Sequence, residues 1–512
     1  GNASKVQFFV DDAVALEVDG ANAEYWVFKG FITGVAAGMH RVSARAIYTN
    51  PDAVLDSPPV LVTVTTPTYD KTVTLTADVT LSGATGYELV GSAGKRIKLD
   101  GGGHSITSAD GATGPLTLKF VDVYNLGDTT DTSQPAVDVT TSGTVTIEDS
   151  IVDTSNSFNL GTNGGASIQR NLFRSNMRQP IGQAPRGTNP GASYPALHIT
   201  GKSTTPKIFA SNNIGAGWVH FESAASWTVG GDVDAASNIA IGARAGIWAE
   251  MSDNMLIKRN YTHHVYYGGW SQGSNYELTS TPTMTVENNV INDSSWPVRG
   301  VACEFRYNLV LAAGHEFLWA DSNASVHHNL FVGGDSDIAS LYLINNPTNV
   351  QIYNNTIDGM LYTDYVTALQ ITGGSAAFSS NLPLNIPHPP GGAQGAAVTI
   401  TAGTLTSDYN AFAGPQTVDY SDMRTPAHDQ SFPDASGAQL TALPTVDFDL
   451  DEATIWNRTT SVRDILSQYR MKYLPKAGSP LIDKGDPAGG AGNDIGCVGA
   501  GTANAADQFG TL

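Results

Sequence analysis

The sequence has little cysteine and little positive charge. Cys303 and Cys497 are the two cysteines among 512 residues, and their wide separation favours two unpaired thiols over a disulfide framework. Lys and Arg number 27 against 48 Asp and Glu, which gives a net charge of −21. Nucleic acid and anionic membrane surfaces both require clustered basic groups, so we expect neither as a partner. No apolar run approaches the length of a membrane span.

One short phrase returns along the chain: an apolar residue, two polar residues, an asparagine and a further residue that is usually apolar. From Asn260 onward its asparagines are roughly 19 to 29 residues apart, a period typical of solenoids, whose units bury their apolar faces by stacking. Asparagine tolerates the left-handed backbone of a turn, and its amide can bond to the same residue in the next coil. The fold class indicated is all-β, a parallel β-helix. The asparagines are Asn171, Asn260, Asn289, Asn308, Asn329, Asn355 and Asn381.

Residues 1–66 differ from the rest, because short strand-like runs alternate there with Gly, Asp, Asn and Pro turns. The runs fall at 5–10, 24–29, 40–48 and 60–66. The phrases that begin at Val6 and Gly38 resemble the bacterial immunoglobulin-like modules of secreted carbohydrate-active enzymes. That resemblance implies a small immunoglobulin-like β-sandwich and a secreted or cell-surface bacterial protein.

We expect the β-helix over 71–413, with a long loop at 174–195, and an irregular capping tail over 414–512 with a helix near 460–473. The phrase KLDGGGHSI at 98–106 resembles the entry coils of pectate-lyase-like β-helices. The segments SPLIDKGDP and NDIG in the tail resemble the closing segment of bacterial right-handed parallel β-helix proteins, with Cys497 in place of the usual alanine. This resemblance implies a right-handed helix whose tail covers the open strand edge of the last coil. It implies no single reaction, since the superfamily contains lyases, hydrolases, epimerases and depolymerases.

Alignment of the coils predicts one outward column of side chains on neighbouring strands. Two strands carry the same kind of triplet, Trp248-Ala-Glu250 and Trp319-Ala-Asp321. Four of the eight tryptophans fall within 248–319, and rings that stack on sugar faces explain this crowding better than a narrow core does. A decorated solvent face is the alternative. The predicted column is Glu250, Tyr267, Arg299, Asp321 and Asn345, and the side chains expected to bind substrate are Trp248, Tyr267, Trp270, Trp296, Trp319, His264 and Asn345.

Hydrolysis of a glycosidic bond is the first chemistry that such a groove suggests. It needs two carboxyl groups roughly 5 Å apart, or about 6.5–9.5 Å apart when a water lies between them. Glu250 and Asp321 would lie three coils apart, about 14 Å by strand spacing, and so cannot be the pair. The strand that ends at Asp321 resembles the active-site coil of β-helix xylosidases, which implies a catalytic aspartate, although Asn345 stands where their second acid lies. The candidate partners of Asp321 are Glu304, Glu316, Asp335 and Asp337.

Elimination from a uronic acid is the second chemistry. It needs a base beside the acidic C–H bond and a counterion for the carboxylate. Arg299 is the candidate base, with Tyr267 and His264 nearby. A calcium ion is the one cofactor considered, with oxygen ligands from Asp321, Glu250 and Asp253. The histidine pairs at 263–264 and 327–328 suit hydrogen bonding in turns better than zinc, and His198 and His220 extend the groove.

These patterns together predict a secreted polysaccharide-degrading enzyme that acts as a monomer. We favour a glycoside hydrolase, because the acidic balance suits a neutral or weakly charged glycan. The alternatives are a polysaccharide lyase, which would depend on calcium in one version, and a non-catalytic glycan-binding surface protein. The predicted catalytic residues are Asp321, Glu250, Arg299 and Glu304.

Overall fold

The computed structural model is dominated by β-strands. The residues that the structure describes are 3–19, 35–49, 52–57, 60–64, 68–127, 135–154, 158–173, 197–215, 219–241, 246–265, 274–279, 283–294, 296–313, 316–334, 339–343, 345–359, 367–386, 397–414, 420–440, 450–489 and 492–498. Within these ranges, no helix combines the length and the apolar character that crossing a bilayer requires.

The N-terminal residues form one antiparallel sheet in the order β2-β1-β3-β4, with β5 also paired to β3. The predicted runs at 5–10 and 40–48 correspond to strands, as does 60–64 of the run at 60–66. Residues 65–66 and the run at 24–29 lie outside the described residues. A hairpin turn at Asp11 and Asp12, both with positive φ, joins the first two strands. The strands are β1 (Ala3–Val10), β2 (Ala13–Asp19), β3 (Gly38–Thr49), β4 (Asp52–Asp56) and β5 (Val60–Val64).

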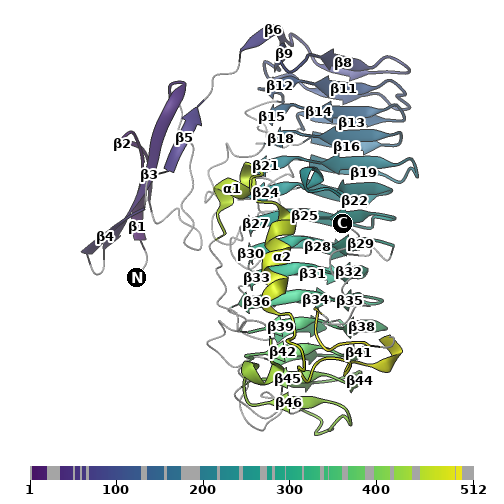
Figure 1. Ribbon diagram of the computed structural model, residues 1–512. Coiled ribbons are helices and arrows are strands. Elements are labelled where there is room, and N and C mark those ends of the chain that lie inside the picture. The colour runs from purple at the N-terminus through teal and green to yellow at the C-terminus, as the bar shows by residue number, and fades with distance from the viewer. Residues whose placement is uncertain are drawn as a thin grey trace.

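Three long parallel sheets follow, and the described residues contribute 13, 13 and 15 strands to them (Figure 1). Sheet 1 contains β7 (Val79–Leu81), β10 (Ile106–Ser108), β13 (Val137–Thr141), β16 (Phe158–Thr162), β19 (Leu197–Gly201), β22 (Val219–Ala224), β25 (Ile247–Glu250), β28 (Ser274–Thr279), β31 (Trp296–Val301), β34 (Leu318–Ala320), β37 (Ala339–Leu343), β40 (Thr367–Ile371) and β43 (Val398–Ile400). Sheet 2 contains β8 (Tyr87–Val90), β11 (Leu116–Lys119), β14 (Val145–Glu148), β17 (Ala166–Gln169), β20 (Lys207–Ala210), β23 (Trp227–Gly230), β26 (Leu256–Lys258), β29 (Thr285–Glu287), β32 (Glu304–Arg306), β35 (Ser325–His327), β38 (Val350–Tyr353), β41 (Ser375–Ser379) and β44 (Thr404–Asp408). Sheet 3 contains β6 (Tyr69–Thr74), β9 (Arg96–Asp100), β12 (Val121–Tyr124), β15 (Ile151–Asp153), β18 (Leu172–Phe173), β21 (Asn213–Gly215), β24 (Ile239–Ile241), β27 (Tyr261–Val265), β30 (Val290–Ser294), β33 (Leu309–Ala313), β36 (Leu330–Gly334), β39 (Thr356–Asp358), β42 (Leu382–Leu384), β45 (Ala411–Ala413) and β46 (Gln430–Phe432).

Each coil of the chain supplies one strand to each sheet, so a strand pairs with the strands three places before and after it. Thus β25 lies between β22 and β28. This stacking is consistent with a parallel β-helix, as the asparagine period predicts. Parallel pairing begins at β6 and continues through β46, beyond the predicted end at 413.

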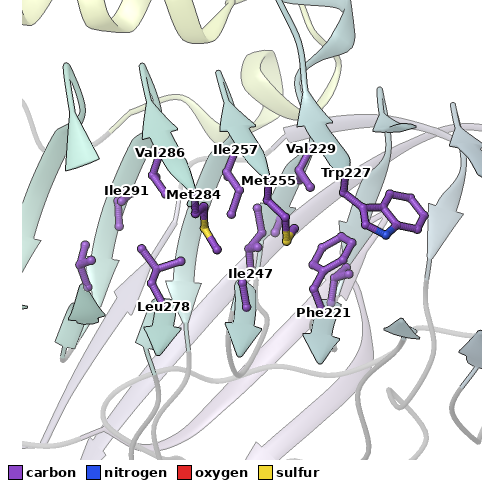
Figure 2. Packing of buried hydrophobic residues seen from close by; sticks show 14 of the residues in the cluster. Phe221, Trp227, Val229, Ile247, Met255, Ile257, Leu278, Met284, Val286 and Ile291 are labelled. Atoms are coloured by element: carbon purple, nitrogen blue, oxygen red, sulfur yellow. The ribbon is translucent and has the colours of Figure 1, made fainter. Parts of the chain in front are cut away.

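The interior between the three sheets is apolar. Figure 2 shows Phe221, Ile247 and Leu278 of sheet 1 pointing toward side chains from the other sheets. Trp227 is also part of this core and is 1% exposed. The interior therefore holds large rings as well as aliphatic side chains, and a tryptophan in this chain does not by itself mark a groove.

An unbroken ladder of asparagines runs through the turn between sheets 2 and 3. In each rung an Nδ2 group donates to Oδ1 of the next asparagine at 2.9–3.2 Å. The predicted stacking of amides is confirmed, and Asn212 and Asn238 fill the gap between Asn171 and Asn260. The rungs are Asn171, Asn212, Asn238, Asn260, Asn289, Asn308, Asn329, Asn355, Asn381 and Asn410.

The left-handed backbone of this turn belongs mostly to the residue before the asparagine, which corrects the role predicted for the asparagine itself. Arg259, Tyr307 and His328 have φ values of 54°, 56° and 54°, and each precedes a rung. Because the preceding residue makes the turn, the asparagine side chain can point inward. At positions such as Asn308 its amide is fully buried. Such buried amides must be hydrogen-bonded, and the ladder meets that requirement.

The C-terminal tail covers the outer surface of sheet 3 (Figure 1). It contains α1 (Glu452–Trp456) and α2 (Val462–Lys472), with short 3₁₀ turns at η3 (Ala435–Ala438) and η4 (Pro487–Gly489), while η2 (Asp234–Ala236) lies in an earlier coil. The helix predicted at 460–473 is confirmed as α2. Leu309, Leu330 and Leu382 point outward from sheet 3 and pack against the tail, which explains why these strands are buried on both faces.

The described tail residues contact both the end of the solenoid and earlier coils. At the end, Gln430 Nε2 of β46 donates to the carbonyl of Pro480 at 3.3 Å, and Ser479 Oγ donates to the carbonyl of Ala438 at 2.7 Å, while coverage of the last strand edge stays a prediction. The NDIG segment bonds to earlier coils: the backbone N–H of Cys497 donates to Thr356 Oγ1 at 3.0 Å, and Asn354 Nδ2 donates to the carbonyl of Asp494 at 2.6 Å. Further along the same face, Asn213 Nδ2 donates to the carbonyl of Trp456 at 3.0 Å. The tail is therefore a lengthwise cover of sheet 3, and this leaves sheet 1 as a face on which to look for a site.

Candidate functional site

The outer face of sheet 1 carries a row of rings in register. His198 of β19 lies opposite His220 of β22, which lies opposite Trp248 of β25. In each strand the neighbouring residues are buried and these three point outward, because side chains alternate along a strand. The His198 and His220 rings are stacked with centroids 5.0 Å apart, and the His220 and Trp248 rings with centroids 4.5 Å apart.

Two glutamates form a second row on the same face. Glu222 lies two residues after His220, and Glu250 lies two residues after Trp248, so the glutamates are register partners on adjacent strands. Nε2 of His198 donates to Oε2 of Glu222 at 2.8 Å, while Nε2 of His220 lies 3.7 Å from Oε2 of Glu250. Sheet 1 therefore holds two imidazoles and two carboxyl groups close together over three strands.

Partial burial shifts the pKa values of Glu250 and His220. Burial, with a smaller contribution from the charge of Glu222, raises the pKa of Glu250. Burial also lowers the pKa of His220 to about 4, with a further lowering from His198. His220 is therefore a neutral imidazole near pH 7, and its buried Nε2 atom makes no hydrogen bond to any residue that the structure describes.

A second polar group lies further along sheet 1. The guanidinium carbon of Arg299 lies 4.1 Å from the ring centroid of Trp319, and the Trp319 and Tyr342 rings meet edge to face with centroids 5.9 Å apart. Asp321 follows β34, and burial raises its pKa. This group has one cation and two rings on the same outward face, which suits a polar ring such as a sugar.

The predicted column is wrong in its register. Between Glu250 and Arg299, sheet 1 contains β28, in which Glu277 is opposite both Trp248 and Arg299. Arg299 is thus in line with Trp248 and not with Glu250. The predicted column took its second strand from residues 264–268. His264 and Val265 lie in β27 of sheet 3, whereas 266–268 lie outside the described residues, and the sheet 1 strand of this coil is β28.

The predicted site residues are accordingly distributed over different parts of the solenoid. Glu250, Trp248, Arg299 and Trp319 are in sheet 1, and Asp321 follows its strand β34. His264 is in β27 of sheet 3, and Asn345 is exposed in the turn after β37. Trp296 is in β31, with its side chain outside the described residues, as are Tyr267 and Trp270 entirely.

Glu304 faces away from this cluster. It lies in β32 of sheet 2, where Oε1 accepts from Arg306 at 2.9 Å and is 3.3 Å from Nε2 of His327. Arg306 also pairs with Glu287, so Glu304 belongs to a chain of alternating charges. The structure places it with ion-pair partners and not beside Asp321.

Glu222 is the residue that sequence reasoning missed. The strands Val219-His-Phe-Glu222 and Ile247-Trp-Ala-Glu250 share one pattern, apolar-ring-apolar-acid. Comparison of these two strands would have placed the carboxyl groups side by side. Glu222 also belongs to the group of possible metal ligands found among the described residues. The donor atoms of His198, His220 and Glu222 all lie within 4.8 Å of one another.

The histidine pairs have other environments. His263 forms an ion pair with Glu452 of the tail, and Nδ1 of His327 lies 2.9 Å from Nδ1 of His328 in the turn before Asn329. The contact between His327 and His328 agrees with the predicted hydrogen bonding in turns, whereas His263 is buried in strand β27 and pairs with the tail, which corrects the prediction for that residue. Comparison with protein-family models, curated proteins and solved structures finds no match for this chain.

Proposed function

We propose that this protein is a glycoside hydrolase that cleaves a polysaccharide on the outer face of sheet 1. The observation that carries the proposal is the register of Glu222 and Glu250 on adjacent parallel strands. Neighbouring strands are about 4.8 Å apart, close to the roughly 5 Å between the two carboxyl groups of a retaining glycosidase. This pair replaces the predicted partnership of Asp321 and Glu304.

The contacts support a separate role for each glutamate in this proposal. His198 holds Glu222 through the 2.8 Å hydrogen bond, which fixes the carboxylate that would attack the anomeric carbon. Glu250 would protonate the glycosidic oxygen as the bond breaks, and would then take a proton from the water that releases the sugar from Glu222.

The surroundings suit a carbohydrate chain. Trp248 stands beside the pair, and Arg299, Trp319 and Tyr342 continue along the same face at successive strands. Stacking rings and a cation would bind sugar units on one side of the cleaved bond. The net charge of −21 favours a neutral or weakly charged glycan over a polyanion.

The broader setting belongs to the same proposal. We infer a right-handed, pectate-lyase-like β-helix from the DGGG and SPLIDKGDP motifs, and an immunoglobulin-like module from residues 1–66. We also infer a secreted or cell-surface bacterial enzyme that acts as a monomer. A lyase remains the second candidate, because Arg299 on the same face could bind a uronate carboxylate, with or without calcium.

The test is incubation with a panel of neutral and uronate polysaccharides. New reducing ends without absorbance from an unsaturated uronate support hydrolysis. Unsaturated products would overturn it in favour of the lyase, and binding without cleavage of any glycan would favour the non-catalytic surface protein.

A further inference from the structure

The donor atoms of three side chains on sheet 1 converge, and these side chains are His198, His220 and Glu222. The three side chains come from two adjacent strands and point outward from the same face. Their donor atoms lie within 4.8 Å of one another. Nε2 of His198 already lies 2.8 Å from Oε2 of Glu222, whereas Nε2 of His220 is buried and has no hydrogen-bond partner within the described ranges.

We propose that these three side chains bind a divalent transition-metal ion of the zinc type. In a tetrahedral zinc site with bonds near 2.0–2.1 Å, ligand atoms are roughly 3.3 Å apart. The separations between 2.8 Å and 4.8 Å in this cluster bracket that value, so small side-chain rotations would bring all three atoms to one ion.

Stacking between neighbouring strands orients the two imidazole rings. The His198 and His220 rings are stacked with planes 19° apart, so that both present an edge to the same space. Trp248 lies against the other face of His220 at 4.5 Å and limits rotation of that ring. The two rings are thereby restricted to small movements before a metal binds, which reduces the entropy lost on binding.

The donor set selects the class of metal. Two imidazoles and one carboxylate suit zinc and its neighbours, whereas calcium prefers oxygen ligands alone. The three proposed ligands therefore differ from Asp321, Glu250 and Asp253 of the predicted calcium site, and they favour a different metal. A fourth ligand would be water or Glu250, whose Oε2 lies 3.7 Å from Nε2 of His220.

If the proposed function holds, a bound metal ion should affect catalysis. Glu222 cannot attack an anomeric carbon while its carboxylate is bound to a metal ion. Zinc and glycoside hydrolysis should therefore exclude each other, and zinc should act as an inhibitor that competes with substrate.

The experiment measures binding without any substrate. The full chain is stripped with a chelator and titrated with zinc chloride by calorimetry, and we expect one ion per chain. His198→Ala and His220→Ala should each weaken binding tenfold or more, while His428→Ala, an exposed histidine paired with Asp408, should leave it unchanged. Glu222→Gln, which keeps the side-chain size, should also weaken binding, and circular dichroism confirms that each variant is folded.

Cobalt(II) gives an independent spectroscopic reading, since a tetrahedral site with nitrogen and oxygen ligands has visible absorption bands that hexaaqua cobalt lacks at comparable strength. The proposal is overturned if zinc does not saturate, or if His198→Ala and His428→Ala bind it equally. Zinc binding without hydrolysis of any glycan would refute only the proposed function. Hydrolysis that requires zinc would overturn the predicted competition.

Discussion

The backbone N–H of Asn410 donates to Oδ1 of Asp429 at 2.8 Å, so the asparagine ladder ends on a carboxyl group instead of an amide. The other oxygen of Asp429 accepts from the hydroxyl of Tyr420 at 2.6 Å. Burial raises the pKa of Asp429 even though these hydrogen bonds act to lower it. The last rung is thus the one whose charge depends on pH.

Asp429→Asn should remove a pH dependence of stability. Because the pKa is raised in the folded protein, the folded state holds the proton more tightly, and the free energy of unfolding falls as pH rises from the unfolded pKa of about 3.9 through the folded value. The asparagine keeps the acceptor for Asn410 without a charge, so urea unfolding between pH 4 and pH 8 should lose this component. At pH 7 the variant should be at least as stable as the parent.

Asp429→Ala is the matched comparison at the same position. It leaves the donors of Asn410 without their acceptor, which should cost about 1–3 kcal/mol. Equal destabilisation by alanine and asparagine would show that the ladder does not need an acceptor at this point.

Asn308→Ala should destabilise the middle of the solenoid. Asn308 is fully buried, and its Oδ1 accepts from both the backbone N–H and Nδ2 of Asn289. Loss of that acceptor leaves two buried donors without a hydrogen bond. The free energy of unfolding, measured with a chemical denaturant, should fall by about 3 kcal/mol. Asn163→Ala, at an exposed asparagine outside the ladder, should change stability by less than about 0.5 kcal/mol. Similar losses in both variants would contradict a structural role for the ladder.

The ladder also shows how much of the fold could be predicted from the sequence. The repeated phrase was sufficient for the stacked parallel coils, because hydrophobic period and turn residue act locally. It missed Asn212 and Asn238, which lie in Ser-Asn-Asn and Ala-Ser-Asn-Ile and lack the full phrase. At those coils the hydrogen bonds between rungs identify the repeat where the surrounding residues do not.

The site was less predictable than the fold. The sheet 1 strand β28 begins at Ser274, nine positions after the end of β27, and no pattern within one coil reveals that spacing. Trp248, Arg299 and Trp319 were correctly placed on one face, whereas His264 and Glu304 belong to other sheets. Glu222 lies 28 positions before Glu250 in the sequence, and the two are brought side by side only by the register of β22 and β25.

Glu222→Gln and Glu250→Gln should each lower kcat at least a hundredfold on whichever glycan the protein cleaves, because each removes a proton-transfer or nucleophilic group. Glu304→Gln, on sheet 2, should keep kcat within about threefold. Initial rates of reducing-end release give the comparison, and thermal unfolding shows whether each variant is folded. Normal turnover in both sheet 1 variants would refute the assigned pair.

Leu466→Ala should loosen the tail. Leu466 is buried against the apolar outer surface of sheet 3, and its truncation should cost about 2–4 kcal/mol. Met471→Ala on the same helix is the control, because Met471 is 51% exposed. Limited proteolysis should cut the tail of the Leu466 variant sooner than that of the control. If the two variants resist protease equally, the tail is not held by this contact.

The tail also changes how the solenoid should unfold. A solenoid alone has contacts only between neighbouring coils, and it can fray from either end in small steps. Here Arg458 bonds to the carbonyl of Ser237, and Tyr473 donates to Asp358 at 2.8 Å, which ties the C-terminal segment to coils 115 and 221 positions earlier in sequence. Such contacts raise the contact order and should slow folding. They should also join the central coils into one cooperative unit, which opens only after the tail has been released.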